Sequence, residues 1–144
     1  MPLHGFSSLC DKHAVQIISR DKKNRQYHKG MNTQKAYVTH YLIDGKVIKA
    51  GSRCDFLLIN EDTKTAYLIE LKGSDLVKAA SQLEETERIL HQELLAYRVL
   101  YRIVANKCKT QEIKSSAYRK YQLRWKGRLL LQTKRIEEEI IPGI

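Results

Sequence analysis

Gly51-Ser-Arg-Cys-Asp-Phe-Leu-Leu-Ile-Asn60 and Ala66-Tyr-Leu-Ile-Glu-Leu-Lys-Gly73 are two largely apolar runs, separated by the polar residues 61–65. Two such runs joined by a short polar connector predict a β-hairpin. Side chains alternate between the faces of a strand, so Glu70 and Lys72 share one face of a strand that is otherwise suited to burial. Unpaired charges are costly in such a place, and fold stability alone does not call for them.

A third charged residue, Asp55, opens the first run and could face Glu70 across the hairpin. Two carboxylates and a lysine at one end of a small sheet indicate a metal site with a neighbouring positive charge. Hard cations such as Mg²⁺ prefer carboxylate and carbonyl oxygens together with water. The alternative is a buried or edge ion pair between Glu70 and Lys72, but the third carboxylate favours the metal site.

These residues resemble the catalytic signature of the PD-(D/E)XK nuclease superfamily, which includes type II restriction endonucleases and archaeal Holliday junction resolvases. The match consists of Asp55 and then, after a hairpin-length gap, Glu70-Leu71-Lys72, with Gly51-Ser52 before and a helix after. Cys54 stands where the family name has proline, a position that varies widely in the superfamily. The resemblance implies an α/β fold: a single restriction-endonuclease-like domain with a central mixed β-sheet flanked by helices, in the order α-β-β-β-α-β.

The resemblance also implies a reaction, the metal-dependent hydrolysis of a phosphodiester bond with Mg²⁺ or Mn²⁺ as the cofactor. Asp55, Glu70 and the main-chain carbonyl of Leu71 would bind the metal, which polarises the phosphodiester and lowers the pKa of a bound water. Lys72 would orient that water or help to deprotonate it, and would offset the charge that develops on the phosphate.

Further residues are candidates for the same site. Some branches of the superfamily place a glutamine on the helix after the hairpin, a role that Gln82 could fill, although a surface glutamine is the commoner case. Ser52 could hold a phosphate or a metal-bound water, and its alternative is a turn residue. Several members use an acid from the first helix. Asp11 and Asp21 are the candidates here, and a helix-cap or surface role is the alternative for both.

The charge of the chain points to a polyanionic partner, because Lys and Arg exceed Asp and Glu by 26 to 16, a net charge of +10. From Lys107 to Arg135 a single acid, Glu112, accompanies the basic residues. We predict contacts with the nucleic-acid backbone, which give affinity without base readout, from Ser52, Arg53, Lys22, Lys23, Arg25, Arg119, Lys120, Arg124, Lys126 and Arg128. Trp125, with Tyr118 and Tyr121, could stack on unpaired bases; core packing is the alternative.

Several classes of protein are disfavoured by composition. The three cysteines have no CxxC spacing, which argues against a disulfide framework or a structural zinc site. The five histidines have no HxxxH or HNH-like spacing, which argues against a zinc or histidine-metal nuclease. No apolar stretch is as long as a membrane span, and the first residues lack the pattern of a signal peptide, so we expect a cytoplasmic protein.

The pattern of the 144 residues predicts one domain in three parts. Residues 1–35 are expected to form a first helix, from Ser7-Ser8 to about Arg20, and then a basic loop. Residues 36–105 form the catalytic core, with a hairpin turn at Asp44-Gly45, the motif hairpin, a long helix capped by Ser74 or Asp75, and a strand over 97–105. Residues 106–144 supply a helix over 110–122, a strand over 128–136 and a tail.

The sequence therefore predicts a small metal-dependent endonuclease that acts on DNA, with RNA not excluded. The chain is barely larger than the catalytic core, which favours selection of a structure such as a junction or flap over reading of a base sequence. A homodimer would place two sites on two strands. One alternative is a non-catalytic basic module of the same fold that binds nucleic acid or a partner nuclease. Another is a toxin or effector nuclease domain with a dedicated inhibitor.

Overall fold

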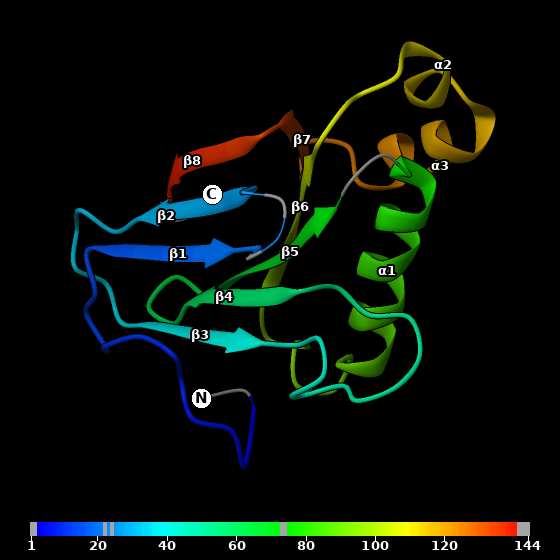
Figure 1. Ribbon diagram of the computed structural model, residues 1–144. Helices are drawn as coiled ribbons and strands as arrows, with labels where there is room; N and C mark the ends of the chain where they lie inside the picture. Colours follow the sequence, from blue (N-terminus) through cyan, green and yellow to red (C-terminus); the bar gives the residue numbers. More distant parts are fainter. Residues whose placement is uncertain (1–2, 22, 24, 73–74, 141–144) are drawn as a thin grey trace.

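Two β-sheets and three helices make up the fold, which is described here from a computed structural model (Figure 1). The structure describes residues 3–140 except 22, 24, 73 and 74. For Lys72 it describes the backbone but not the side chain. The elements are β1 (Gln16–Arg20), β2 (Tyr27–Met31), β3 (Val38–Leu42), β4 (Phe56–Asn60), β5 (Thr65–Lys72), α1 (Leu76–Ile89), β6 (Arg98–Ala105), α2 (Thr110–Ile113), α3 (Ser116–Arg124), β7 (Leu129–Thr133) and β8 (Arg135–Glu139).

Both sheets are mixed, which confirms the α/β class. The larger sheet has the order β3-β4-β5-β6-β7, in which β3, β4 and β5 are antiparallel neighbours while β6 and β7 continue parallel to β5. The smaller sheet has the order β1-β2-β8, with β1 antiparallel and β8 parallel to β2. Helix α1 connects the parallel strands β5 and β6. No helix among the described residues is long and apolar enough to cross a membrane.

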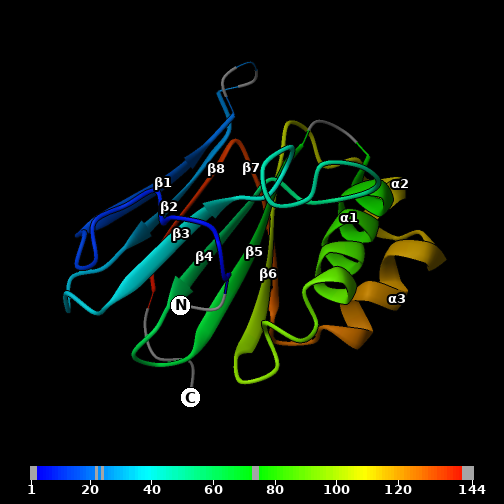
Figure 2. The same ribbon diagram turned by 90° about the horizontal axis from the view of Figure 1, so that it is seen from below.

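The larger sheet lies between the smaller sheet on one face and the three helices on the other (Figure 2). Strand β5 therefore contributes to two cores. Tyr67, Ile69 and Leu71 pack toward the smaller sheet, whereas Ala66 and Leu68 pack with the residues of α1. This alternation is the predicted one, and by the same alternation Glu70 faces the helices.

The motif hairpin is confirmed as β4 and β5, paired from Phe56–Ile69 to Asn60–Thr65. The side chain of Asn60 forms the turn, because its Oδ1 accepts hydrogen bonds from the amides of Asp62 (3.1 Å) and Thr63 (3.2 Å). Helix α1 begins where the sequence predicts. Asp75 is its N-cap and accepts a hydrogen bond from the amide of Lys78 at 2.9 Å.

The expected first helix is wrong: its C-terminal part is strand β1, and no helix precedes α1 in the described residues. Ile17 and Ser19 are buried while the residues between and around them are exposed, which is the two-residue period of a strand. Val15, Ile17 and Ile18 are branched at Cβ, which favours a strand over a helix. The described part of the chain therefore lacks the first element of the predicted α-β-β-β-α-β order.

Three other boundaries differ from the prediction. The turn at Gly45 (φ 80°) leads to no second strand, because the amide of Ile48 returns to the carbonyl of Ile43 (3.0 Å) and β4 pairs with β3 instead. The region 110–122 divides into α2 and α3. The expected strand over 128–136 divides into β7 and β8 at Lys134 (φ 68°), because the two halves belong to different sheets.

Gly30 of β2 allows the two sheets to approach closely. A Cβ at this position would lie 2.7 Å from Cδ2 of Leu58 and 3.1 Å from Cγ2 of Ile140, both of which are buried. We expect Gly30→Ala to lower the free energy of unfolding by about 1–3 kcal/mol, the usual cost of overpacking, in urea denaturation. Leu58→Val makes room, so the double variant should lose less than the sum of the two single losses. Strictly additive losses would contradict this account.

A buried histidine, His40 of β3, gives the stability a dependence on pH. Its ring stacks on Phe56 with centroids 5.2 Å apart, and its Nε2 lies 2.9 Å from Oγ of Ser19. Burial, and to a lesser degree the neighbouring His28, lower the pKa of His40 from 6.5 to about 4. Between these values the unfolded chain binds a proton that the folded chain does not, so the free energy of unfolding falls as the pH is lowered.

We expect this group to remove about 3 kcal/mol of stability between pH 6.5 and pH 4. The measurement is the urea midpoint at pH 4–7.5 for the wild type and His40→Gln. In the variant, the number of protons taken up on unfolding over this pH window should be smaller by about one. His91→Gln, at an exposed position, is the control and should behave as the wild type. Identical pH dependences for His40→Gln and the wild type would refute the assignment.

Candidate active site

Asp55 lies just before β4 at an irregularity in the pairing of β4 with β5. Phe56 is the registered partner of Ile69, and the amide of Asp55 also donates to the carbonyl of Ile69 at 3.1 Å. Two successive residues thus oppose one, which is the pattern of a β-bulge. The bulge directs the carboxylate of Asp55 along β5, where Oδ2 accepts a hydrogen bond from the amide of Leu71 at 2.8 Å.

Glu70 precedes Leu71, so the structure brings the two predicted carboxylates to the same end of β5. Glu70 has no exposed surface. Cys54 lies beside both acids and is fully buried. Burial first, then the negative charge of Glu70 and to a lesser degree that of Asp55, raise the pKa of the Cys54 thiol well above its ordinary value. Cys54 is therefore a neutral, packed thiol and not a nucleophile.

A pocket of about 490 Å³ opens at this end of the sheet. Asp55 and Leu71 line it, and so does Asp21, one of the two acids that the sequence offered from the N-terminal segment. The pocket thus favours Asp21 over Asp11 as an additional acid of the site. The complete lining is Arg20, Asp21, Lys23, Leu42, Asp44, Asp55, Phe56 and Leu71. Glu70 is not part of it and lies behind Asp55 and Leu71.

Helix α1 holds the segment that carries Asp55. Nε2 of Gln82 donates to the carbonyl of Arg53 at 3.0 Å, and Oγ1 of Thr86 accepts a hydrogen bond from the amide of Cys54 at 2.7 Å. Thr86 also donates to the carbonyl of Gln82 at 2.8 Å. Gln82 is therefore near the site, as predicted, but its amide contacts the backbone before Asp55 and not the pocket. Thr86 was not predicted, because a threonine within a helix has no sequence signal of its own.

The donor atoms at this site fit a hard divalent cation. Asp55 and Glu70 offer carboxylate oxygens and Leu71 a main-chain carbonyl, the types of ligand that Mg²⁺ and Mn²⁺ prefer. The described residues contain no group of three His, Cys, Asp or Glu side chains placed to hold a metal. Mg²⁺ usually keeps several waters and is bound through one or two carboxylates, so two suffice. The side chain of Lys72 lies outside the described residues, although its backbone pairs with Ala105 at the end of β5.

The predicted nucleic-acid contacts are divided among several surfaces. Lys23 lines the pocket, whereas Arg25 lines a neighbouring one and Lys22 lies outside the described residues. Ser52 is exposed in the loop before β4 and does not line the pocket. Arg53 is ion-paired with Asp44, with Nε 2.7 Å from Oδ1, which reduces its value as a phosphate ligand.

The contacts predicted from Arg119 to Arg128 lie on and just after α3, which is on the helical side of the larger sheet (Figure 2). Arg119, Lys120 and Lys126 are exposed. Arg124 is ion-paired with Glu84 of α1. The half-buried Arg128 lies over the ring of Tyr101, with Cζ 5.6 Å from its centroid.

Trp125 is a core residue in this structure. Its exposed fraction is 2%, and it stacks on Tyr101 with centroids 3.9 Å apart and planes 10° apart. Tyr118 is 1% exposed, and Tyr121 contacts the indole at 5.0 Å between centroids. These rings pack against one another, so Trp125 has no free face for a base, and core packing, the alternative role that the sequence allowed, is correct for it.

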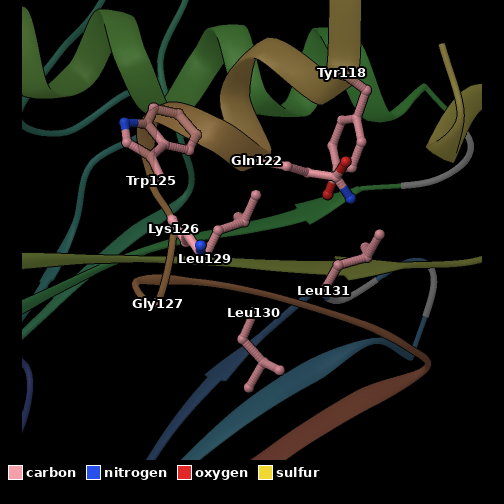
Figure 3. Close-up of a pocket in the computed structure, with 8 residues that line it drawn as sticks. All are labelled: Tyr118, Gln122, Trp125, Lys126, Gly127, Leu129, Leu130 and Leu131. Carbon is pink, nitrogen blue, oxygen red and sulfur yellow. The ribbon is translucent and has the colours of Figure 1, made fainter. Parts of the chain in front are cut away.

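A further pocket, of about 440 Å³, lies between α3 and β7 (Figure 3). Trp125, Tyr118 and Leu129–Leu131 line it together with Gln122, Lys126 and Gly127, and none of these residues is an acid. Its donor atoms therefore do not fit a metal-dependent hydrolysis, and the end of β5 is the better candidate for an active site.

Comparisons with known proteins give no independent assignment. No protein-family model, curated protein or solved structure matches the chain. The functional assignment therefore rests on the residues at the end of β5 and on the surface around them.

Proposed function

We propose that this protein is a metal-dependent endonuclease of the PD-(D/E)XK type that hydrolyses phosphodiester bonds in DNA. The observation that supports it best is the hydrogen bond from the amide of Leu71 to the carboxylate of Asp55, which holds this pocket-lining acid against the residue that follows Glu70 in β5. The order β3-β4-β5-α1-β6, three antiparallel strands followed by a helix and a parallel strand, is compatible with the expected core.

Each residue has a defined task in this proposal. Asp55, Glu70 and the carbonyl of Leu71 would hold Mg²⁺ or Mn²⁺, which would supply Lewis acidity and a water of lowered pKa. Lys72 would orient that water and offset negative charge on the phosphate. Arg20 and Lys23 line the pocket and attract the phosphate backbone toward Asp55.

Selection of a DNA structure such as a junction or flap fits this chain better than reading of a base sequence. Basic residues lie in the loop between β1 and β2 and on α3, where they can contact backbone phosphates. Contacts with phosphates give affinity without sequence information. A homodimer would place two sites on two strands, as resolution of a junction requires.

The test is a cleavage assay on supercoiled plasmid, a flap and a four-way junction, each with Mg²⁺, Mn²⁺ or EDTA, and on single-stranded RNA. We expect metal-dependent cutting of at least one DNA substrate, with a preference for the flap or junction over the plasmid. Binding without any metal-dependent cutting would contradict the proposal.

One observation favours a second candidate, a module that binds nucleic acid without cutting it. Glu70 has no exposed surface and does not line the pocket, so it could serve as a structural acid. This candidate predicts salt-sensitive binding that is indifferent to Mg²⁺ and to the loss of Glu70.

A further inference from the structure

A third pocket, of about 390 Å³, lies near the candidate active site and is lined only by basic and neutral side chains. It is formed by Arg25, Gln26, Tyr27, Asn106, Lys134 and Arg135. Its position is fixed by two hydrogen bonds: the amide of Lys134 donates to the carbonyl of Ala105 at 2.9 Å, and Nε2 of Gln26 donates to that of Val104 at 3.1 Å. Because Ala105 pairs with Lys72, this pocket lies at the same end of the sheet as the candidate active site.

Positive charge is concentrated in this pocket, because three of its lining residues are basic and none is an acid. Glu137, which accepts a hydrogen bond from Tyr27 at 2.6 Å, offsets part of the charge of Arg135. Arg25, Lys134 and Arg135 are exposed, and none of the ion pairs between described residues involves them. Three neighbouring cations repel one another, and an anion bound between them relieves that repulsion. Guanidinium groups bind phosphate oxygens in a bidentate manner, and the side-chain amide of Asn106 is a further donor.

Two of the basic residues have an uncommon backbone conformation. Arg25 (φ 60°) and Lys134 (φ 68°) adopt the left-handed conformation, which is uncommon for a residue with a side chain. Glycine or asparagine would adopt it at lower cost. Asparagine can therefore replace either residue without added backbone strain, and it is the charge and position of the pocket that indicate a ligand.

We propose that this pocket binds a backbone phosphate of the DNA strand that is cut at Asp55. This proposal takes its substrate, DNA, from the proposed function and so rests on it. Lys23 of the active-site pocket and Arg25 of this pocket are two residues apart, so their Cα atoms are separated by at most about 7 Å. A single strand thus contacts both pockets, and the phosphate pocket fixes its path past the active site.

The chain offers a matched pair of variants for the test. The described residues contain four non-glycine positions with positive φ, and all four are basic: Arg25, Lys35, Lys64 and Lys134. The pocket variant is Arg25→Asn with Lys134→Asn, and the control is Lys35→Asn with Lys64→Asn. Both remove two positive charges from left-handed positions that asparagine tolerates. The control residues are exposed and lie at the other end of the sheets, in the β2–β3 and β4–β5 connections.

The measurement is binding of a labelled single-stranded DNA oligonucleotide and its duplex by fluorescence anisotropy, in EDTA, over a series of KCl concentrations. We expect the pocket variant to bind more weakly than the control, and the slope of log K against log [KCl] to fall in magnitude by about 1 for each phosphate that the variant no longer neutralises. Equal affinities and slopes for the two variants would overturn the proposal. The proposal would also be overturned if the two variants differed in their affinity for inorganic phosphate, added as a competitor, but not in their affinity for the oligonucleotide.

The cleavage assay separates this inference from the proposed function. If the wild type cuts DNA but the two variants bind alike, the phosphate pocket is refuted and the nuclease stands. If the variants differ in slope but no substrate is cut with Mg²⁺ or Mn²⁺, the nuclease is refuted and the phosphate pocket stands as part of a binding module.

Discussion

Glu70→Gln should abolish metal-dependent cleavage, with a loss of more than about 100-fold. Loss of a group that only supports a metal ligand typically costs about 10- to 100-fold, and loss of the ligand itself costs more. Glutamine keeps the volume of Glu70 but removes its charge, so the fully buried site is disturbed as little as possible. Asp55→Asn should have the same effect, because asparagine can still accept the hydrogen bond from Leu71 but is a poor ligand for Mg²⁺.

Two matched controls lie at the other end of the same hairpin. Asp62 accepts a hydrogen bond from the amide of Tyr37 at 3.1 Å, so Asp62→Asn repeats the chemical change made at Asp55. Glu61 is 6% exposed, so Glu61→Gln removes a comparably buried charge. Both controls should cut DNA, and both should bind Mn²⁺ as the wild type does in calorimetry. If Glu70→Gln and Glu61→Gln cut equally well, Glu70 is not a metal ligand but a structural acid, and the metal would have to be held without it.

Local signals explain which parts of the fold the sequence predicts. The hairpin of β4 and β5 has apolar runs, alternating faces and an asparagine that closes its own turn, all within residues 55–72. Helix α1 begins at an acidic cap, and that cap too is local. The proposed metal ligands fall within this hairpin, and for that reason a short motif could indicate them.

The smaller sheet depends on contacts that are distant in the sequence. Strand β8 pairs with β2, more than a hundred residues earlier, and no local pattern distinguishes Glu137–Glu139 from a polar tail. The loop between β1 and β2 reaches the pocket of the candidate active site only because this sheet packs across β5. The burial of Trp125 likewise depends on a contact that is distant in the sequence. Its position among basic residues predicted an exposed aromatic side chain, but its ring stacks on that of Tyr101.

Glu138→Ala should strongly destabilise the fold, with a loss of about 3–5 kcal/mol in the free energy of unfolding measured by urea denaturation. Glu138 of β8 accepts hydrogen bonds from Arg102 through both oxygens, at 2.7 and 3.0 Å, and from Nε2 of His28 at 2.7 Å. Arg102 is 8% exposed, so the substitution leaves a buried guanidinium without its carboxylate. Burial acts to raise the pKa of Glu138, but the hydrogen bonds from His28 and Arg102 outweigh it and lower that pKa below its ordinary value.

The neighbouring Glu137 is the control, because its side chain is 40% exposed and its ion pair with Lys29 is long, at 3.8 Å. It also accepts a hydrogen bond from the hydroxyl of Tyr27 at 2.6 Å, but this contact is exposed to solvent. Glu137→Ala should cost less than about 1 kcal/mol. The double variant Glu138→Leu with Arg102→Met replaces the pair by apolar groups and should recover much of the stability, since removal of both charges leaves neither unpaired. If Glu138→Ala and Glu137→Ala are equally stable, the buried pair does not hold the smaller sheet to β6. The smaller sheet would then owe its position mainly to the apolar contacts of Ile17, Ile136 and Ile140.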